Sequence, residues 1–521
     1  MSGQNSGNQP KEEVTFRQMF AILLGIGAIV IYQRVGSVQR FYFLNYEYLW
    51  GSLFAFIVVL IAVAIWQIMK RTKSLSDRMG LLGEAAKKYG SIYVGNSGDG
   101  VRLYLSEEQR TGHVQVLGST GRGKTESVIV SWLFRDLKNG KNALLIDGKG
   151  DPGLVRHITS ISKYLMKSPR IVTFDLGNPA ASCTTNPIGQ GSAQQITDRL
   201  FTAFQFDDSY YKSVQSDVTL SVIQLVQGDG GQVTFRRIYE LLTDDVILSK
   251  AVSQTKNDVL RAKLTRFLAE PRAQRAEKLS GLLSQIAPFA VGEIAELVNG
   301  ETPGKENFDL CEIVLSRKRE CPTVFIVLIP TLKYQDIGHQ LGRLFLQELG
   351  WAVGERASQS QNGADFIPVY LDEFSAFVYP KFVNILNKAR SSNVALHLSH
   401  QSLGDLGMVS DDFAQIINTN TNVKCIFGVN DPESADWMAA HLGTSTTEKL
   451  TERAQSGFLT PRQKTGDVSI REVEAYKVHP NLLKNFTHGR GVLHFPTQRG
   501  SLTEVIQFER LGSADVTGEH D

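Results

Sequence analysis

Residues 118–125 read GSTGRGKT and constrain this chain more than any other segment. A glycine-rich turn that ends in Lys-Thr is the pattern with which proteins hold nucleotide phosphates, because glycines let backbone N–H groups converge on phosphate oxygens. Residues 113–117 (HVQVL) are predicted to form a short buried strand, and residues 126–138 show the apolar spacing of an amphipathic helix. The order of strand, turn and helix is the order that such a loop requires.

We therefore predict that ATP and Mg²⁺ bind at this loop. The Lys124 ammonium is placed to reach the β- and γ-phosphates, and the Thr125 hydroxyl is placed to ligate Mg²⁺. The residues predicted to surround the nucleotide are Gly118, Ser119, Thr120, Gly121, Arg122, Gly123, Lys124, Thr125 and Glu126.

A second acidic motif follows in residues 366–373, where a mostly apolar strand ends in Asp372 and Glu373. Asp372 is predicted to hold the Mg²⁺ shell, and Glu373 to orient and deprotonate the attacking water. Residues 394–399 form another short strand, with Gln401 just past its end. Because ligands bind beyond the carboxyl ends of parallel strands, Gln401 is predicted to sense the γ-phosphate or position water. The alternative for Gln401 is a polar loop residue.

The N-terminal region predicts a membrane anchor with two transmembrane helices, at about 18–35 and 49–69. Residues 19–32 are an uncharged apolar run of 14, and residues 49–69 are an uncharged run of 21, close to the ~20 residues that a spanning helix needs. A signal peptide or re-entrant segment is the alternative for the first run, and a buried core helix for the second. The basic residues that follow at 70–78 place that end, and both termini, in the cytoplasm.

Composition sets few limits on function. The 55 basic and 53 acidic residues leave a net charge of +2, which neither demands nor excludes nucleic acid. The four cysteines show no C-x-x-C spacing and are predicted to be reduced thiols. A chain of 521 residues exceeds what one core supports, so two or three domains are expected.

Strands alternate with helices on both sides of a long segment in which apolar residues recur only at helical spacing. This pattern predicts an α/β fold with a parallel sheet and an all-helical insertion. The basic residues of the insertion fit a solvated helix face or a DNA groove. The predicted organisation is an anchor at 1–73, a nucleotide-binding domain at 74–191 and 301–511, an all-α insertion at 192–300, and a polar tail at 512–521.

The combination resembles one family. The chain looks like the type IV secretion coupling proteins of the TraG/TraD class, which are related to FtsK and HerA. The resemblance lies in the segments GSTGRGKTES, IDGKGDP, VYLDEFSAF and NKARSSNVALHLSHQS, together with the two spans and the helical insertion. The resemblance implies a RecA-like P-loop domain and a DNA-stimulated ATPase that couples a DNA–protein complex to a secretion channel in conjugation. It implies a hexamer in the bacterial inner membrane, multi-pass, with most of the chain in the cytoplasm.

The implied partners are DNA bound without sequence preference, single- or double-stranded, a relaxase with accessory DNA-processing proteins, and subunits of the type IV secretion channel. Carried over to this chain, the resemblance places Lys124 and Thr125 at nucleotide and Mg²⁺, and Gln401 at the γ-phosphate. It implies that Arg390 acts on the nucleotide of a neighbouring subunit, where spacing alone allows a surface arginine.

Arg122 departs from the family loop, in which a small residue is usual, and could point at the neighbouring subunit. Two other functions remain open from the residues. One is a membrane docking receptor for secreted protein effectors, and the other is an FtsK-like chromosomal DNA translocase.

Overall fold

The computed structural model describes residue 25 and residues 52–65, 91–206, 208–315, 321–359, 365–455 and 463–511. Residues 1–80 and 81–521 form two compact units. In the first unit, residues 52–65 are helical and fall inside the second predicted span. Among the described residues, no helix has the length and apolarity needed to cross a membrane. Apart from residue 25, the first predicted span lies outside the described residues, as does the polar tail at 512–521.

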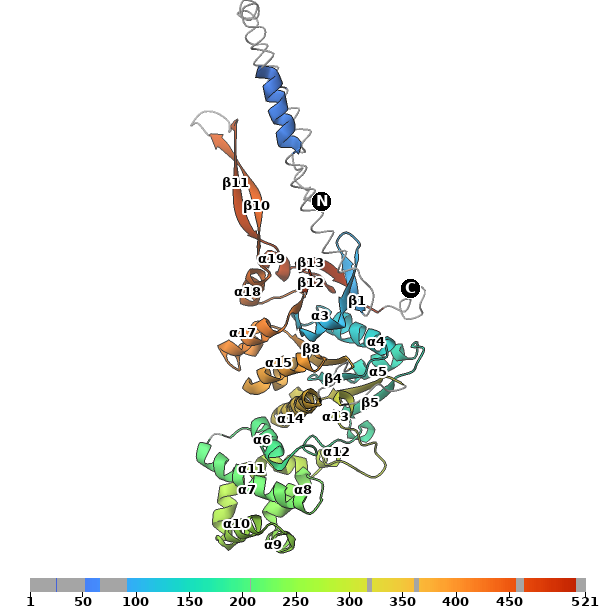
Figure 1. Ribbon diagram of the computed structural model, residues 1–521, viewed down its shortest axis with the longest axis vertical. Helices are drawn as coiled ribbons and strands as arrows, with labels where there is room; N and C mark the ends of the chain where they lie inside the picture. The colour runs from blue at the N-terminus through green and yellow to red at the C-terminus, as the bar shows by residue number, and fades with distance from the viewer. Residues whose placement is uncertain are drawn as a thin grey trace, which may run out of the picture. The chain divides into compact units, whose positions relative to one another are not determined.

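The second unit is built on one mixed sheet (Figure 1), in the order β2-β1-β13-β12-β9-β3-β8-β7-β4-β6-β5 among the described residues. The parallel strands are β3 (Val114–Leu117), β4 (Ala143–Asp147), β5 (Arg170–Asp175), β6 (Thr323–Leu328), β7 (Ile367–Asp372), β8 (Val394–His400) and β9 (Val423–Ile426). The antiparallel strands are β1 (Ser91–Ser97), β2 (Arg102–Ser106), β12 (Arg490–Thr497) and β13 (Gly500–Phe508).

The parallel strands are apolar because helices cover both faces of the sheet. Side chains alternate between the faces, so Leu144 and Ile146 join one apolar cluster while Ala143 and Leu145 join the other. Every residue of β4, β6, β7 and β8 is buried, as expected of a parallel sheet with two covered faces. One face is covered by α4 (Ser131–Lys138) and α5 (Pro152–Ser162), and the other by α6 (Ala193–Ala203), α14 (Thr331–Ser358), α15 (Val383–Ser391) and α17 (Asp411–Asn420).

Between β5 and β6 the described residues form helices and no strands. After α6 these are α7 (Ser209–Gly228), α8 (Phe235–Thr243), α9 (Asp245–Gln254), α10 (Asp258–Ala269), α11 (Arg272–Ala290), α12 (Ala295–Val298) and α13 (Cys311–Val314). Helices α7 to α11 gather at one end of this unit (Figure 1). Their apolar residues belong to the same cluster as those of α14, so this segment and the sheet share one continuous core. The domain boundaries at 192 and 300 remain a prediction.

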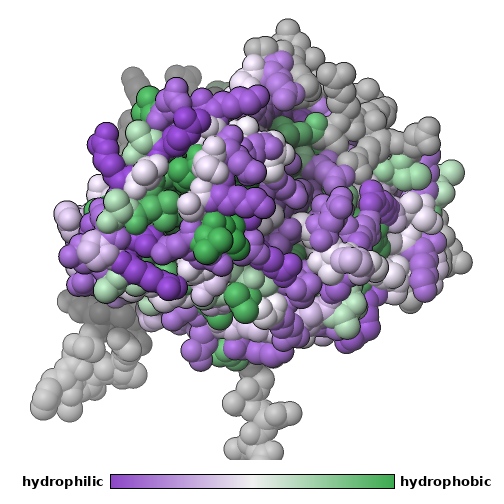
Figure 2. Space-filling view, turned by 90° about the horizontal axis from the view of Figure 1, so that it is seen from below, coloured by the Kyte–Doolittle hydropathy of each residue, from purple (hydrophilic) through white to green (hydrophobic). Residues whose placement is uncertain are grey.

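Several basic residues of the helical segment are neutralised by carboxylates. The ion pairs are Arg261–Asp258 at 2.7 Å, Lys263–Asp217 at 2.5 Å, Arg275–Asp245 at 2.7 Å and Lys278–Glu270 at 2.7 Å. Figure 2 looks at this end of the molecule and shows a largely hydrophilic surface with small separate apolar patches. These pairings favour the solvated-face interpretation of the basic stretch over a DNA groove.

The remaining elements are short helices and turns along the chain and one further pair of strands near its carboxyl-terminal end. They are α3 (Glu107–Thr111), η2 (Pro179–Ala181), η3 (Phe374–Phe377), η4 (Pro380–Phe382), α16 (Leu403–Gly407), α18 (Pro432–Leu442), α19 (Pro480–Lys484), β10 (Thr444–Gln455) and β11 (Gln463–Tyr476). Strands β10 and β11 form a separate antiparallel pair, which projects from the end of the unit opposite α7 to α11 (Figure 1).

A buried polar network ties α4 to the middle of β7 and β8. The Arg110 guanidinium makes two parallel hydrogen bonds of 2.7 Å to Asp136 and donates to the Tyr370 hydroxyl at 2.9 Å. It also donates to His397 Nε2 at 3.1 Å. Burial, then the Arg110 charge, lowers the pKa of His397, so the ring is neutral and its nitrogen accepts. Such fully satisfied networks fix one arrangement of the elements they join.

Helix α14 carries a fully buried carboxyl group at Glu348. Its Oε1 atom accepts a hydrogen bond from Cys311 Sγ at 3.3 Å. Burial raises the pKa of Glu348 from 4.5 to about 8. The carboxyl group is therefore protonated at neutral pH in the folded chain and ionised in the unfolded chain.

This difference predicts a pH-dependent stability. Because the folded-state pKa is the higher one, the contribution of Glu348 is complete below about pH 4.5 and is lost as the pH rises towards about 8. Relative to Glu348→Gln, which stays neutral, the wild type should lose up to about 4 kcal/mol of unfolding free energy over that range. Urea unfolding of both proteins at each pH measures the difference. Parallel curves for the two proteins would contradict it.

Candidate nucleotide-binding site

The loop of residues 118–124 joins β3 to a helix, in the predicted order. The helix begins as the π-helix η1 (Thr125–Val130) and continues as α4, where the sequence led us to expect a single α-helix over 126–138. Gly121 and Gly123 have φ angles of 75° and 95°, a region that glycine adopts without strain. A Cβ atom on Gly118 would lie 2.7 Å from the Cβ of Phe427. The loop geometry therefore requires glycine at these positions.

Distant parts of the chain hold the outer side of the loop. The Ser119 N–H donates to the Gly428 carbonyl at 2.8 Å, and the Asn430 N–H donates to Ser119 Oγ at 2.9 Å. The Arg122 guanidinium donates to the Phe486 carbonyl and to Asn430 Oδ1, both at 3.1 Å. The sequence left open that Arg122 points at a neighbouring subunit. In the structure it anchors the loop to its own chain.

Lys124 is buried beneath the loop and donates to the carbonyls of Gly118 and Ser119. Burial lowers the pKa of its ammonium group, and the nearby carboxylates oppose that effect. Glu126, at the start of the helix, forms an ion pair of 2.7 Å with Arg510. The loop is thus closed around its own lysine, with its backbone held from outside.

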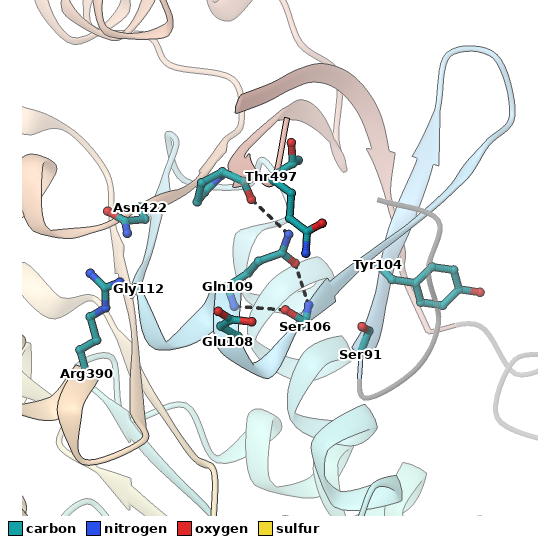
Figure 3. Close-up of a pocket in the computed structure, with 11 residues that line it drawn as sticks. Ser91, Tyr104, Ser106, Glu108, Gln109, Gly112, Arg390, Asn422 and Thr497 are labelled. Carbon is teal, nitrogen blue, oxygen red and sulfur yellow. Dashed lines mark hydrogen bonds between the residues drawn. The ribbon is translucent and has the colours of Figure 1, made fainter. Parts of the chain in front are cut away.

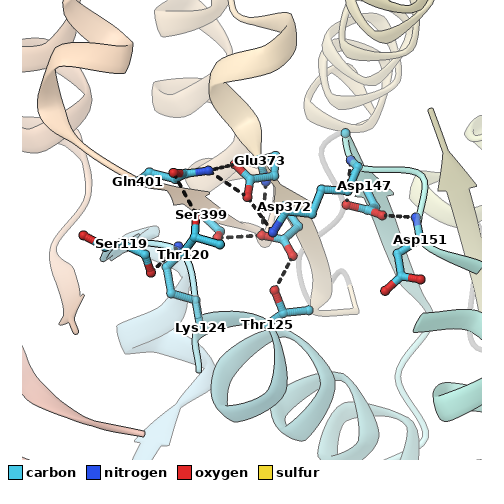
Figure 4. Close-up of polar contacts among 12 residues, drawn as sticks. Ser119, Thr120, Lys124, Thr125, Asp147, Asp151, Asp372, Glu373, Ser399 and Gln401 are labelled. Atoms are coloured by element: carbon cyan, nitrogen blue, oxygen red, sulfur yellow. Dashed lines mark hydrogen bonds and ion pairs between the residues drawn. The ribbon is translucent and has the colours of Figure 1, made fainter. Parts of the chain in front are cut away.

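Asp372 lies at the carboxyl end of β7, and its carboxylate accepts hydrogen bonds from two hydroxyl groups (Figure 4). Thr125 Oγ1 donates to its Oδ2 at 2.7 Å, and Ser399 Oγ donates to its Oδ1 at 2.7 Å. The two hydroxyls come from the helix after the loop and from β8. The predicted Mg²⁺ residues Thr125 and Asp372 are therefore in direct contact.

Glu373 follows in a left-handed backbone conformation, with φ 50° and ψ 45°. Gln401 Nε2 donates to the Glu373 carboxylate at 3.1 Å, while Thr120 Oγ1 donates to Gln401 Oε1 at 3.0 Å. Gln401 therefore links the loop to the acidic pair (Figure 4). The structure brings together every residue predicted for the site except Arg390.

Three residues around this cluster had no assigned role from sequence. Ser399 is one, Asp147 is the last residue of β4, and Lys149 lies in the turn that follows. The Lys149 ammonium contacts Glu373 Oε1 at 2.7 Å. Burial, then the charge of Asp372, raises the pKa of Asp147 to about 6. The sequence carried a signal for Asp147 and Lys149, because Asp-Gly-Lys follows directly on a buried strand. Once β4 is known to pair with β7, that strand end lies at the same edge of the sheet as the loop.

Arg390 lies at the opposite edge of the sheet, at the end of α15 and just before β8. It lines a pocket of about 410 Å³ together with Gln109, Gly112 and Asn422 (Figure 3). Strand β8 has seven residues, which separates its two ends by about 20 Å. Arg390 therefore cannot reach the loop of its own chain.

The order of the strands and the residues at their carboxyl ends define the class of protein to which this fold belongs. Strand β8 lies between the loop strand β3 and the carboxylate strand β7, and the loop, the carboxylates and Gln401 meet at the carboxyl ends. This is a mixed α/β fold of the P-loop ATPase type.

Comparisons with known proteins narrow the class. The family model for the TraM recognition site of TraD and TraG matches residues 367–483. The type 4 coupling protein DotL of Legionella pneumophila is 22% identical over an alignment of 444 residues, which covers 73% of this chain and 56% of DotL. The chain thus spans about half the length of that relative.

Solved structures share the fold. The unbound conjugative coupling protein TrwB, in its deltaN70 form, aligns with a TM-score of 0.57 and 15% identity over 84% of this chain and 94% of TrwB. VirB4 of Thermoanaerobacter pseudethanolicus aligns with a TM-score of 0.53 and 14% identity over 82% of this chain and 99% of VirB4. TrwB has also been solved with the ATP analogue ADPNP and with ADP and Mg²⁺. Together, the motifs and these matches support a likeness of this chain to the type IV secretion coupling proteins.

The Thr125–Asp372 contact gives a direct test of the site. Thr125→Val keeps the branched shape but removes the hydroxyl, so Mg²⁺ should no longer strengthen the binding of an ATP analogue, and the affinity with Mg²⁺ should fall about tenfold. Thr120→Val is the matched control, since its hydroxyl contacts Gln401 and not Asp372. Titration calorimetry with and without Mg²⁺ measures both. Equal Mg²⁺ dependence in the two variants would contradict the assignment.

Proposed function

We propose that this chain is an ATP-hydrolysing coupling protein that moves DNA with its bound protein into a type IV secretion channel. The observation that carries the proposal is the meeting of the loop, Asp372, Glu373 and Gln401 at one edge of the sheet. The TrwB complexes with nucleotide and Mg²⁺ support it for a protein of the same fold.

The residues present fit Mg²⁺ and ATP. The left-handed glycines of the loop leave backbone N–H groups for phosphate oxygens. Thr125 and Asp372 offer a hydroxyl and a carboxylate, both of them the oxygen ligands that Mg²⁺ takes. Bound there, Mg²⁺ would neutralise phosphate charge. Lys124 would exchange its carbonyl partners for phosphate oxygens, because the charged acceptor is the stronger one.

Glu373 and Gln401 would act on the attacking water. The Glu373 carboxylate would accept a proton from the water, and the Gln401 amide would orient that carboxylate through its hydrogen bond. Gln401 also contacts Thr120 in the loop. A movement of the loop when the γ-phosphate is lost would therefore displace Gln401, which follows the end of β8. That route connects hydrolysis to movement of the sheet edge.

Arg390 supports a ring assembly. The length of β8, about 20 Å, separates it from the carboxyl-end edge where its own loop lies, so a role in hydrolysis requires the nucleotide of another subunit. We propose a hexamer in which each Arg390 completes the neighbouring site. DNA would pass through the centre, gripped at its backbone without sequence preference.

The membrane location and the partners complete the proposal. The uncharged run at 49–69 and the basic residues after it support an inner-membrane anchor, with residues 1–73 crossing twice and most of the chain in the cytoplasm. The family description for residues 367–483 names the TraM recognition site of TraD and TraG. We propose that this region binds an accessory DNA-processing protein and that the complex brings a relaxase to the channel.

DNA-dependent hydrolysis tests the motor proposal. We expect the full-length chain, purified in detergent, to hydrolyse ATP at least about tenfold faster with DNA at low salt, and the stimulation to fall steeply as salt rises. Lys124→Ala and Glu373→Gln should each remove hydrolysis. Single- and double-stranded DNA are compared in a phosphate-release assay. ATP turnover that ignores DNA in assembled rings would contradict the motor and favour a docking receptor for protein effectors.

Subunit mixing tests the Arg390 assignment. Arg390→Ala and Lys124→Ala should each be inactive alone, since one lacks the donated arginine and the other cannot hold phosphate. Mixed rings should regain part of the activity, because some sites pair an intact loop with an intact arginine. Steady-state hydrolysis against mixing ratio measures this. A strictly additive, inactive mixture of subunits shown to exchange would contradict an action between subunits.

A further inference from the structure

Lys149 is a charged residue at the site that the proposed hydrolysis does not use. Its Nζ atom lies 2.7 Å from Glu373 Oε1, and the two side chains are 46% and 11% exposed. The cation therefore reaches from near the surface onto the carboxylate that is proposed to activate water.

The turn that carries Lys149 is built to direct it there. Asp147 Oδ1 accepts the N–H of Lys149 at 3.0 Å, and Asp147 Oδ2 accepts the N–H of Asp151 at 2.9 Å. Gly150 has a φ of 64°, and a Cβ atom there would lie 2.6 Å from Pro330. The backbone on both sides of Lys149 is thus held in one conformation, so its contact with Glu373 is a property of the fold.

The same turn is bonded to the end of the carboxylate strand. The Gly148 N–H donates to the Asp372 carbonyl at 3.2 Å, and the Gly148 carbonyl accepts from Thr331 Oγ1 at 2.8 Å. Lys149 and Glu373 are therefore presented by two backbones that are joined directly.

Glu373 is engaged on both carboxylate oxygens. Lys149 holds Oε1, and Gln401 Nε2 donates to Oε2 at 3.1 Å and to Oε1 at 3.3 Å. A carboxylate that must accept a proton from water needs a free lone pair in the direction of that water. In this arrangement the ammonium of Lys149 competes with water for Glu373.

We propose that Lys149 is a resting partner of Glu373, which suppresses hydrolysis until the loaded site draws the ammonium away. The proposal rests on the proposed ATPase function. The charges at the site explain why the Lys149 ammonium would move away from Glu373. In this arrangement Lys149 adds positive charge beside Asp372 and Glu373, while Lys124 is turned onto the loop carbonyls. Mg²⁺ at Asp372 would repel the ammonium, and the γ-phosphate would attract it. Lys149 is thus a positioning residue that acts through Glu373.

The test compares Lys149→Met with Lys278→Met in the full-length chain. Lys278 makes an ion pair of the same length, 2.7 Å, with Glu270 in the helical segment. Without DNA, Lys149→Met should raise ATP hydrolysis about fivefold over wild type, the effect of losing a partly exposed ion pair. With saturating DNA its rate should stay within about twofold of wild type, so the stimulation ratio falls. Lys278→Met should change neither rate, and Lys149→Arg should keep the low basal rate.

A second background separates positioning from structure. In Glu373→Gln, which should already lack hydrolysis, the added Lys149→Met change should restore none of it, whereas a structural role of Lys149 would lower the thermal midpoint in both backgrounds. Loss of hydrolysis with and without DNA in Lys149→Met would overturn the proposal, and so would rates equal to those of Lys278→Met. A wild type that hydrolyses no ATP under any condition contradicts the ATPase function itself, and with it any need for a resting partner. An active wild type with an unaffected Lys149→Met contradicts this inference alone.

Discussion

Two hydroxyl groups converge on Asp372, and this convergence depends on three strands lying in one order. Thr125 follows β3, Asp372 ends β7, and Ser399 belongs to β8, which lies between them. Neighbouring strands in a sheet are about 4.8 Å apart, so only a strand inserted between β3 and β7 can offer side chains to both. If β7 paired directly with β3, Gln401 could not bridge Thr120 and Glu373. The order of the strands is therefore what makes the edge a site.

The site is held from below and from outside by parts of the chain that carry no chemistry. Arg110 joins α4 to β7 and β8 in a buried network, which fixes the height of the helix against the carboxylate strand. Residues 428–430 and 486–489 hold the outer side of the loop. Glu373 itself sits in a left-handed conformation that costs about 1 kcal/mol or more. In that conformation its N–H donates to Asp372 Oδ1 at 3.1 Å, and its carbonyl accepts from the Ala376 N–H at 2.9 Å.

The positions of the loop, the acidic pair and Gln401 at the ends of strands could be predicted from the sequence, because each follows a run that reads as a buried strand, while their roles remain predictions. The sequence also predicted the parallel sheet and the helical segment between β5 and β6. It did not assign Lys149 or Ser399, because their roles depend on which strands are neighbours. The β10–β11 pair and the antiparallel strands after β9 were not foreseen, since polar residues dominate 444–476 and a two-stranded pair leaves little apolar periodicity to read. The separation of Arg390 from its own loop likewise emerged only with the sheet.

A structure of the full-length chain with Mg²⁺ and a non-hydrolysable ATP analogue tests the central claim most directly. The account predicts the γ-phosphate beside Lys124, the metal between Thr125 and Asp372, and Lys149 separated from Glu373 while Gln401 stays near it. A nucleotide bound away from the loop, or at the loop with the metal remote from Asp372, would contradict the claim that this edge of the sheet is the site.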